Sequence, residues 1–225
     1  MPAVTGPTTD GRLTRRLGDV LPVPRLVLAS ASPARRNLLA AAGVDAEVMV
    51  SGVDESTVDS PSAELLCLTL ARLKAEAVAA RLARISDPGD TLVLGCDSVL
   101  AFAGQILGKP ADADEARQRW RAMRGRAGVL HTGHCLIRLT EGKRADGVAR
   151  TTVRFAEVTD QEIEAYVGTG EPLHVAGAFT IDGLGAAFVE SIEGDHTNVI
   201  GLSLPMLRRL LAELGIGLTD LWTAR

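Results

Sequence analysis

The chain has 225 residues and a formal net charge of -4, and only 3% of its residues are aromatic. This length is sufficient for one substantial hydrophobic core. Because an acidic chain with few aromatic rings lacks both an overall positive field and stacking platforms for bases, we expect no nucleic-acid partner.

The sequence also argues against a membrane or disulfide-stabilised protein. No run approaches the roughly 18 apolar residues that span a bilayer, so we predict no membrane segment. Cys67, Cys96 and Cys135 are far apart, which suggests neither a disulfide framework nor a Cys-x-x-Cys metal site. We therefore expect a cytoplasmic protein.

From about residue 25 onward, strand-like apolar runs alternate with helical patterns, which is typical of an α/β domain. Residues 1–24 are predicted to be a flexible N-terminal extension of a single domain over 25–225. The predicted strands are 26–30, 46–50, 91–96, a hairpin over 98–107, 129–139, 147–157 and 186–191. The predicted helices are 33–42, 62–84, 112–123, 160–168 and 205–214. Turns within the hairpin and after 129–139 favour antiparallel pairs, so we expect a mixed, twisted sheet with flanking helices.

The first predicted helix carries two arginines where helix electrostatics disfavour them. Ser32 fits the N-cap and Pro33 the first helical position, so Arg35 and Arg36 lie in the first turn. The helix dipole already makes this end positive, and a bound phosphate or carboxylate would offset the extra charge. Solvation of both guanidinium groups is the alternative.

Further along, the chain offers two carboxylates and a lysine with unusual surroundings. Asp54 and Glu55 follow the second strand and either bind a hard cation or form an ordinary acidic turn. In the helix 62–84, Lys74 has apolar residues three and four positions away on both sides, which places it on the apolar face. Its ammonium group either snorkels to solvent or enters a cleft.

The strand 91–96 is predicted to deliver Asp97 at its carboxyl end, where open α/β sheets collect ligands. A carboxylate there can orient water, act as a general base or hold Mg²⁺, and the alternative is a cap on the next turn. Lys109 precedes Pro110, which keeps the backbone extended and projects the ammonium group. The glycine-rich stretch 168–185 is predicted to be an ordered loop region that carries binding groups.

These positions together outline a site for a nucleotide polyphosphate. The side chains predicted to bind the oligophosphate are Ser30, Arg35, Arg36, Lys74 and Lys109. The carboxylates predicted to hold a divalent metal and water are Glu55 and Asp97.

Sequence blocks over roughly residues 25–215 resemble the Maf family of nucleoside triphosphate pyrophosphatases, in the family's order. The blocks are LASASPARR at 28–36, VDE at 53–55, LARLKA at 70–75, GCDSV at 95–99, GKP at 108–110, TGEPL at 169–173, AGAF at 176–179, IEGD at 192–195 and NVIGL at 198–202.

This resemblance implies an ITPase-like fold with two lobes around a central cleft. It also implies hydrolysis of the α–β phosphoanhydride of non-standard or surplus nucleoside triphosphates, with Mg²⁺ or Mn²⁺, to the monophosphate and pyrophosphate. Asp97 falls on the family's catalytic acid, which is described as activating water.

Three positions resemble the family's specificity positions: Ala34, Ser98 and Asp182. Pyrimidine-preferring members resemble Ser-Pro-Arg-Arg in the first block, whereas here the arginine pair comes one residue later, as in the branch associated with 7-methyl-GTP. Asp182 stands where these branches carry Gln or Glu, so it is a candidate acceptor for purine N–H groups. Ser98 matches neither pattern, and the preferred base stays open.

The resemblance also carries an association with septum formation, so a nucleotide-binding regulator of cell division is the alternative function. Asp97 beside Glu55 and the lysines favours catalysis, because binding alone needs no base near the phosphates. The absence of a Walker A sequence disfavours another nucleotide-dependent transferase. The oligomeric state is left open, with a homodimer among the options.

Overall fold

The computed structural model describes residues 23–84 and 89–222, and its centre is a seven-stranded sheet. The strands are β1 (Arg25–Leu28), β2 (Ala46–Val48), β3 (Thr91–Phe102), β4 (Gln105–Leu107), β5 (Ala127–Arg138), β6 (Lys143–Phe155) and β7 (Val189–Gly194). The helices are α1 (Pro33–Ala41), α2 (Ala63–Leu82), α3 (Ala113–Met123), α4 (Asp160–Gly168), α5 (His196–Ile200) and α6 (Leu204–Glu213). Short 3₁₀ turns are η1 (Glu55–Thr57), η2 (Glu171–His174), η3 (Ala176–Ala178), η4 (Leu184–Phe188) and η5 (Leu218–Leu221).

The sheet is mixed, as predicted. Its strand order is β2-β1-β3-β5-β6-β7, and β4 pairs with β3 outside this path. β1 runs parallel to both β2 and β3, whereas the other pairs are antiparallel. A sheet of this kind with helices on its faces confirms the predicted α/β class.

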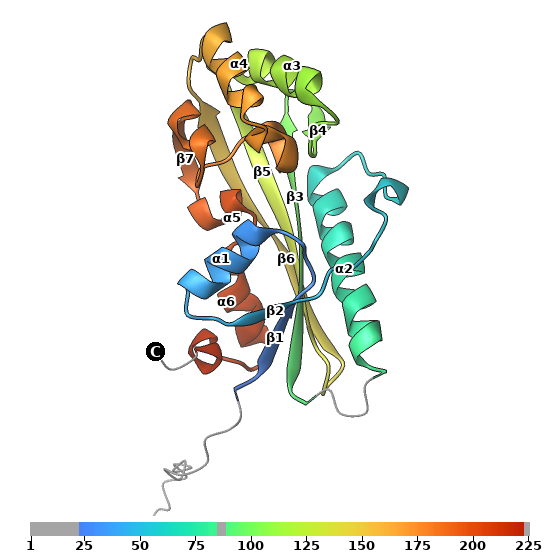
Figure 1. The fold of residues 1–225 in the computed structure, drawn as a ribbon. Coiled ribbons are helices and arrows are strands. Elements are labelled where there is room, and N and C mark those ends of the chain that lie inside the picture. The colour runs from blue at the N-terminus through green and yellow to red at the C-terminus, as the bar shows by residue number, and fades with distance from the viewer. Residues whose placement is uncertain (1–22, 85–88, 223–225) are drawn as a thin grey trace, which may run out of the picture.

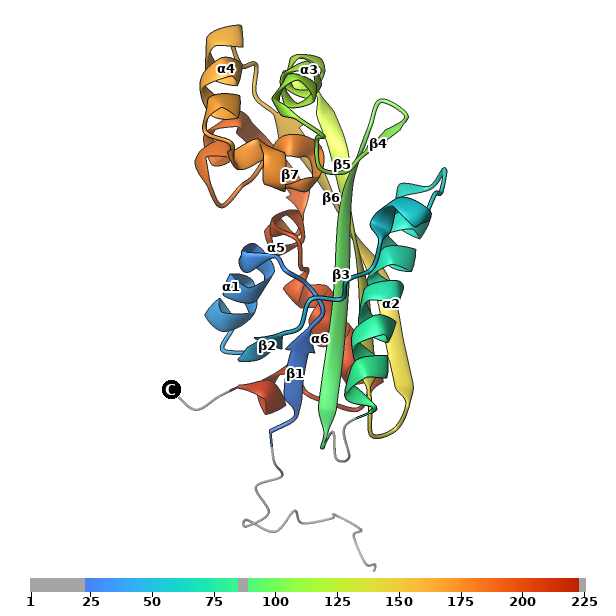
Figure 2. The same cartoon turned by 45° about the vertical axis from the view of Figure 1, so that its right-hand side comes forward.

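Helices cover both faces of the sheet around β1 and β3 (Figures 1 and 2). Side chains of β3 alternate between these faces: Leu92, Leu94 and Cys96 belong to the apolar cluster that includes α6, whereas Val93 belongs to the cluster under α2. This period of two is the ordinary consequence of strand geometry. This alternation determines which face of the sheet each functional side chain of β3 reaches.

A second lobe with its own apolar core forms at the other end of the long strands, beneath α3 and α4 (Figure 1). Trp120 is fully buried at its centre, makes edge contacts with Phe155 and Tyr166, and donates from Nε1 to the carbonyl of Ala178 at 2.7 Å. Because β3, β5 and β6 run through both cores, the two lobes share one sheet.

The structure differs from the predicted boundaries in two informative places. A break was expected between 91–96 and the hairpin, but β3 is continuous because β5 pairs with it from Leu92 to Ala101. The last strand was expected over 186–191 but begins at Val189, because the preceding residues form η4. The backbone N–H groups of Leu184 and Gly185 donate to the Glu171 carboxylate, each at 3.0 Å, and so are not available to a ladder.

The predicted N-terminal extension lies almost wholly outside the described residues, so its flexibility and the domain limits remain predictions. Among the helices that the structure describes, none has the length and apolar character required to cross a membrane.

Two glycines let α2 approach the sheet at backbone distance. A Cβ atom on Gly95 would lie 2.2 Å from the carbonyl oxygen of Ala71, and one on Gly133 would lie 2.3 Å from that of Cys67. Gly95 is on β3, Gly133 is on β5, and both contacts are with α2 backbone. The glycines therefore set the depth at which α2, and with it Lys74, packs against β3.

We expect the Gly95→Ala substitution to lower the free energy of unfolding by about 1–3 kcal/mol, because the added methyl group must push the α2 backbone away. Chemical denaturation measures this change. The control is Gly168→Ala at the end of α4, where a Cβ meets nothing within 4 Å. Equal stability of the Gly95→Ala variant and the parent chain would contradict the tight packing.

Candidate functional site

The edge of β3 that pairs with β1 and β4 has no strand partner along its middle. β1 pairs with β3 from Thr91 to Leu94, and β4 pairs with it from Leu100 to Phe102. β5 follows the opposite edge throughout. The segment 95–99 of β3 therefore forms a gap in the ladder, and Asp97 lies at its centre.

The prediction that Asp97 ends a strand is wrong, because Asp97 lies within β3. The strand that ends beside it is β1, which stops at Leu28 opposite Leu94. After β1 the chain turns into α1 through Ser30 and Ser32, so a loop and a helix start face the gap. The site was expected at the carboxyl end of the strand 91–96. It lies instead at the carboxyl end of β1, beside the middle of β3.

On the α2 face of the sheet, Lys74 joins the two predicted metal-binding carboxylates. Its Nζ lies 2.6 Å from Asp97 Oδ1 and 2.7 Å from Glu55 Oε1. The side chains of Lys74 and Asp97 are each only 9% exposed, whereas that of Glu55 is 55% exposed. Of the two alternatives for Lys74, the ammonium group enters the site instead of snorkelling to solvent.

Burial raises the pKa of Asp97 above its ordinary value, because a carboxylate loses hydration there. The positive charges of Lys74 and Arg35 oppose this effect but do not cancel it, and the nearby Glu55 carboxylate adds to it. A carboxylate with a raised pKa is a stronger base than an ordinary aspartate, while Lys74 holds one of its oxygens in place. Asp97 Oδ2 makes no hydrogen bond within the described chain.

On the opposite face, Arg35 joins three separate segments at the gap. Its Nε donates to the carbonyl of Gly201 at 2.7 Å, Nη1 donates to Ser30 Oγ at 3.0 Å, and Nη2 donates to Ser98 Oγ at 3.1 Å. The residue is only 9% exposed. A buried guanidinium group held by three oxygen acceptors keeps the loop after β1, β3 and the segment after α5 together.

A directed chain of hydrogen bonds continues from Arg35 through β3 and β5 to α5. Thr132 Oγ1 donates to the carbonyl of Asn198 at 3.2 Å, so its single proton is used there. The 2.9 Å contact between Ser98 and Thr132 hydroxyl oxygens is therefore donated by Ser98, which itself accepts from Arg35. Sequence reasoning gave no role to Thr132, Asn198 or Gly201, although the NVIGL block contained the last two.

The two arginines of α1 have different environments. Ser32 caps the helix by accepting from the backbone N–H of Arg35 at 3.4 Å, as predicted. Arg36 is exposed, and its guanidinium makes no hydrogen bond or ion pair within the described residues. Arg35 uses donors on all three of its nitrogens for protein contacts, so Arg36 is the member of the pair with a fully available guanidinium.

Glu55 and Asp97 carry the oxygen ligands that suit the divalent cation that the resemblance implied, but Lys74 lies between them. Oxygens of Glu55 and Asp97 converge on one point, which the Lys74 ammonium occupies. Mg²⁺ commonly takes one or two carboxylates and completes its shell with water and phosphate oxygens. Within 23–84 and 89–222, no group of three or more His, Cys, Asp or Glu residues is arranged to hold a metal.

The other predicted residues, Lys109, Ala34 and Asp182, are not part of the hydrogen-bonded groups around Lys74 and Arg35 in the described chain. Lys109 is exposed in the loop after β4, whose antiparallel register pairs Leu107 with Leu100 and directs the following residues along the edge of β3 toward the gap. Ala34 is half-buried in the first turn of α1. Asp182 is exposed between η3 and η4, and no contact joins it to the gap within the described chain.

We expect the pKa of Asp97 to rise further in a Lys74→Met variant, because burial then acts without the adjacent ammonium charge. The chemical shift of the Asp97 carboxyl carbon, followed against pH, measures the midpoint. The control is Lys143→Met, which removes a lysine that is 63% exposed at the start of β6. An unchanged or lower midpoint in Lys74→Met would contradict the described electrostatics.

Comparison with known proteins gives a consistent family. A family model described as Maf-like protein matches residues 25–214. The chain is 66% identical over 199 residues to a protein of Salinispora tropica, covering 88% of each, and 59% identical over 204 residues to one of Streptomyces avermitilis, covering 91% of this chain and 97% of the relative. It is 51% identical over 200 residues to a protein of Nostoc punctiforme, covering 89% and 98% respectively. Each relative is named nucleoside triphosphate pyrophosphatase.

Proposed function

Because this chain belongs to the Maf family, we propose that it hydrolyses nucleoside triphosphates at the α–β phosphoanhydride, releasing the nucleoside monophosphate and pyrophosphate. The names of its relatives support the reaction type. The observation that carries the proposal is the buried Asp97 carboxylate in the gap of β3, held by Lys74 and surrounded by cationic side chains.

Asp97 acts as the general base. Lys74 holds Oδ1, and Oδ2 accepts the proton of a water molecule as that water attacks the α-phosphorus. The new bond joins the water oxygen to the α-phosphorus, and the bond to the oxygen bridging to the β-phosphorus breaks. Pyrophosphate leaves with that oxygen, while Asp97 keeps the proton until solvent removes it.

Positive charge around the gap stabilises the triphosphate and the departing pyrophosphate. Arg36 and Lys109 are exposed cations, one on α1 and one after β4, and thus on either side of the gap. Lys74 and Arg35 add positive charge from the two opposite faces of the sheet. Such fixed charge supplies much of the acceleration in phosphoryl transfer, because it needs no reorganisation during the reaction.

A divalent cation, Mg²⁺ or Mn²⁺, is part of this proposal. Glu55 and Asp97 would hold it, and when bound it would neutralise phosphate charge. Lys74 already binds one oxygen of each carboxylate, so the cation would bind through the oxygen lone pairs that Lys74 does not use.

The substrate base is proposed to meet Ala34, Ser98 and Asp182, as the family resemblance implied. Ser98 is already bonded to Arg35 and Thr132, so it offers the base little hydrogen-bonding capacity. The exposed Asp182 carboxylate would instead accept from purine N–H groups.

Cys67, Cys96 and Cys135 are buried free thiols, which supports placing the enzyme in the reducing cytoplasm.

We expect Asp97→Asn to lower the rate of pyrophosphate release by about 10²–10⁴-fold, because an amide has the shape of the carboxylate but cannot take the proton. The assay measures pyrophosphate and orthophosphate separately over standard, modified and methylated nucleoside triphosphates, with Mg²⁺ or Mn²⁺. Asp114→Asn, which changes a carboxylate that is 86% exposed on α3, is the matched control.

Near-normal pyrophosphate release by Asp97→Asn would overturn the assigned base. Orthophosphate release by the parent chain would mean that a different bond is cut. Tight nucleotide binding with no hydrolysis of any triphosphate would instead support the alternative of a nucleotide-binding regulator of cell division.

A further inference from the structure

Lys109 lies in a loop that the sheet supports only weakly. The preceding strand β4 spans Gln105–Leu107 and pairs with β3 alone. Lys109 itself is exposed and makes no hydrogen bond or ion pair within the described residues. The strand ladder ends before Lys109, so contacts outside the ladder determine how its backbone is held.

Two side chains of α3 hold this loop on either side of Lys109. Arg119 Nη1 donates to the carbonyl of Gly108 at 2.6 Å, directly before Lys109. Glu115 Oε2 accepts from the backbone N–H of Ala111 at 2.7 Å, two residues after it. Pro110 between them is buried and keeps the residue before it extended.

The two clamping side chains also bind each other. Arg119 Nη2 and Nε donate to Glu115 Oε1 at 2.6 and 3.1 Å, one helical turn apart on α3. The Arg119 side chain is only 11% exposed. This pairing fixes the orientation of the carboxylate and of the guanidinium group. Glu115 Oε2 and Arg119 Nη1 then point to the loop and bind its backbone.

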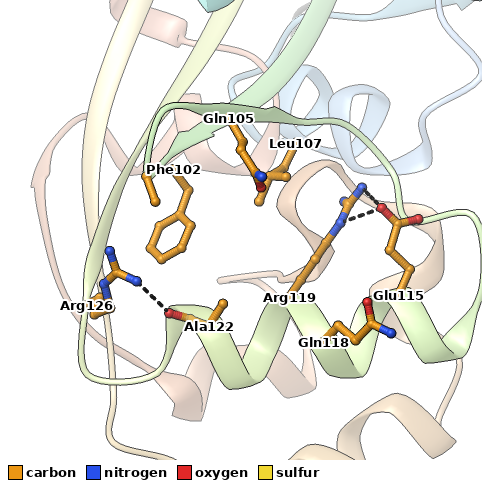
Figure 3. A pocket seen from close by; sticks show the side chains of 9 residues that line it. Phe102, Gln105, Leu107, Glu115, Gln118, Arg119, Ala122 and Arg126 are labelled. Atoms are coloured by element: carbon orange, nitrogen blue, oxygen red, sulfur yellow. Dashed lines mark hydrogen bonds and ion pairs between the residues drawn. The ribbon is translucent and has the colours of Figure 1, made fainter.

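Apolar packing joins the hairpin to α3 over part of their length, since Phe102 and Leu107 lie in the same cluster as Trp120. An open cavity of about 310 Å³ separates the β3–β4 hairpin from α3, with Phe102, Gln105 and Leu107 on one side and Glu115, Gln118 and Arg119 on the other (Figure 3). Apolar packing between the hairpin and α3 is therefore incomplete, and the polar contacts of Glu115 and Arg119 contribute to fixing the loop.

The carbonyl of Gly108 has a second donor, which connects the clamp to the other loop of this lobe. The backbone N–H of Gly177, in η3, donates to it at 3.1 Å. η3 in turn is tied to α3 through Trp120 and Ala178. Hydrogen bonds therefore connect the segment that carries Lys109 to the apolar core of the second lobe.

We propose that Glu115 and Arg119 are positioning residues that aim Lys109 at the triphosphate, a role that rests on the proposed function. Neither side chain touches the reacting atoms. Their effect passes through the loop backbone, whose course along the free edge of β3 leads toward Ser98 and Asp97.

The test is a double-substitution cycle read out by binding. The dissociation constant for inorganic tripolyphosphate, in the presence of Mg²⁺, is measured by calorimetry for the parent chain, Arg119→Met, Lys109→Met and the double variant. We expect each single variant to bind about tenfold more weakly, and the double variant to bind no more weakly than Lys109→Met alone, because both act through one contact.

Further variants separate positioning from general stability. Glu115→Ala should weaken binding, and Glu115→Gln should weaken it less, because the one amide oxygen can still accept from Ala111 but the amide NH2 group cannot accept from Arg119. Arg117→Met is the matched control, since it removes an arginine of α3 that pairs with Asp114 and Glu164 and not with the loop. Melting temperatures check that each variant is folded.

Additive losses in the double variant, or parent-like binding by Arg119→Met, would overturn the positioning role. A parent chain that binds tripolyphosphate but releases no pyrophosphate from any nucleotide overturns the proposed function and leaves the clamp intact. A parent chain that binds no tripolyphosphate overturns both.

Discussion

The interrupted ladder on one edge of β3 is the constraint on which the candidate site depends. β1 ends its pairing at Leu94 and β4 begins at Leu100, so the edge between them is open. Since neighbouring strand residues point to opposite faces, Asp97 reaches α2 and Ser98 reaches the Arg35 side. Functional side chains from the two faces of one sheet therefore lie along a short stretch of strand edge that no other strand pairs with.

Buried charge at this edge is stable only because it is paired. Asp97, Lys74 and Arg35 are each at least nine-tenths buried, and each has an opposite charge or several oxygen acceptors within hydrogen-bonding distance. Gly95 and Gly133 make the pairing geometrically feasible, because they let α2 pack at backbone distance. The same close packing keeps the pKa of Asp97 raised, which suits a base.

Local patterns predicted much of this arrangement. The apolar spacing around Lys74 placed it on the buried face, and Ser32 and Pro33 placed the start of α1. Those patterns did not distinguish Arg35 from Arg36, because adjacent helix residues point about 100° apart and only tertiary structure decides which side is buried. Arg35 is buried by Gly201, far away in sequence, and strand pairing brings Thr132 opposite Ser98. The role of Asp182 in base choice stays a prediction.

The most direct test of the central claim is a crystal structure of the Asp97→Asn variant with a nucleoside triphosphate and Mg²⁺. We expect the phosphates to lie along residues 95–99 of β3, between the Arg36 side of α1 and the loop that carries Lys109. Phosphates bound elsewhere, such as in the cavity beside α3, would contradict it.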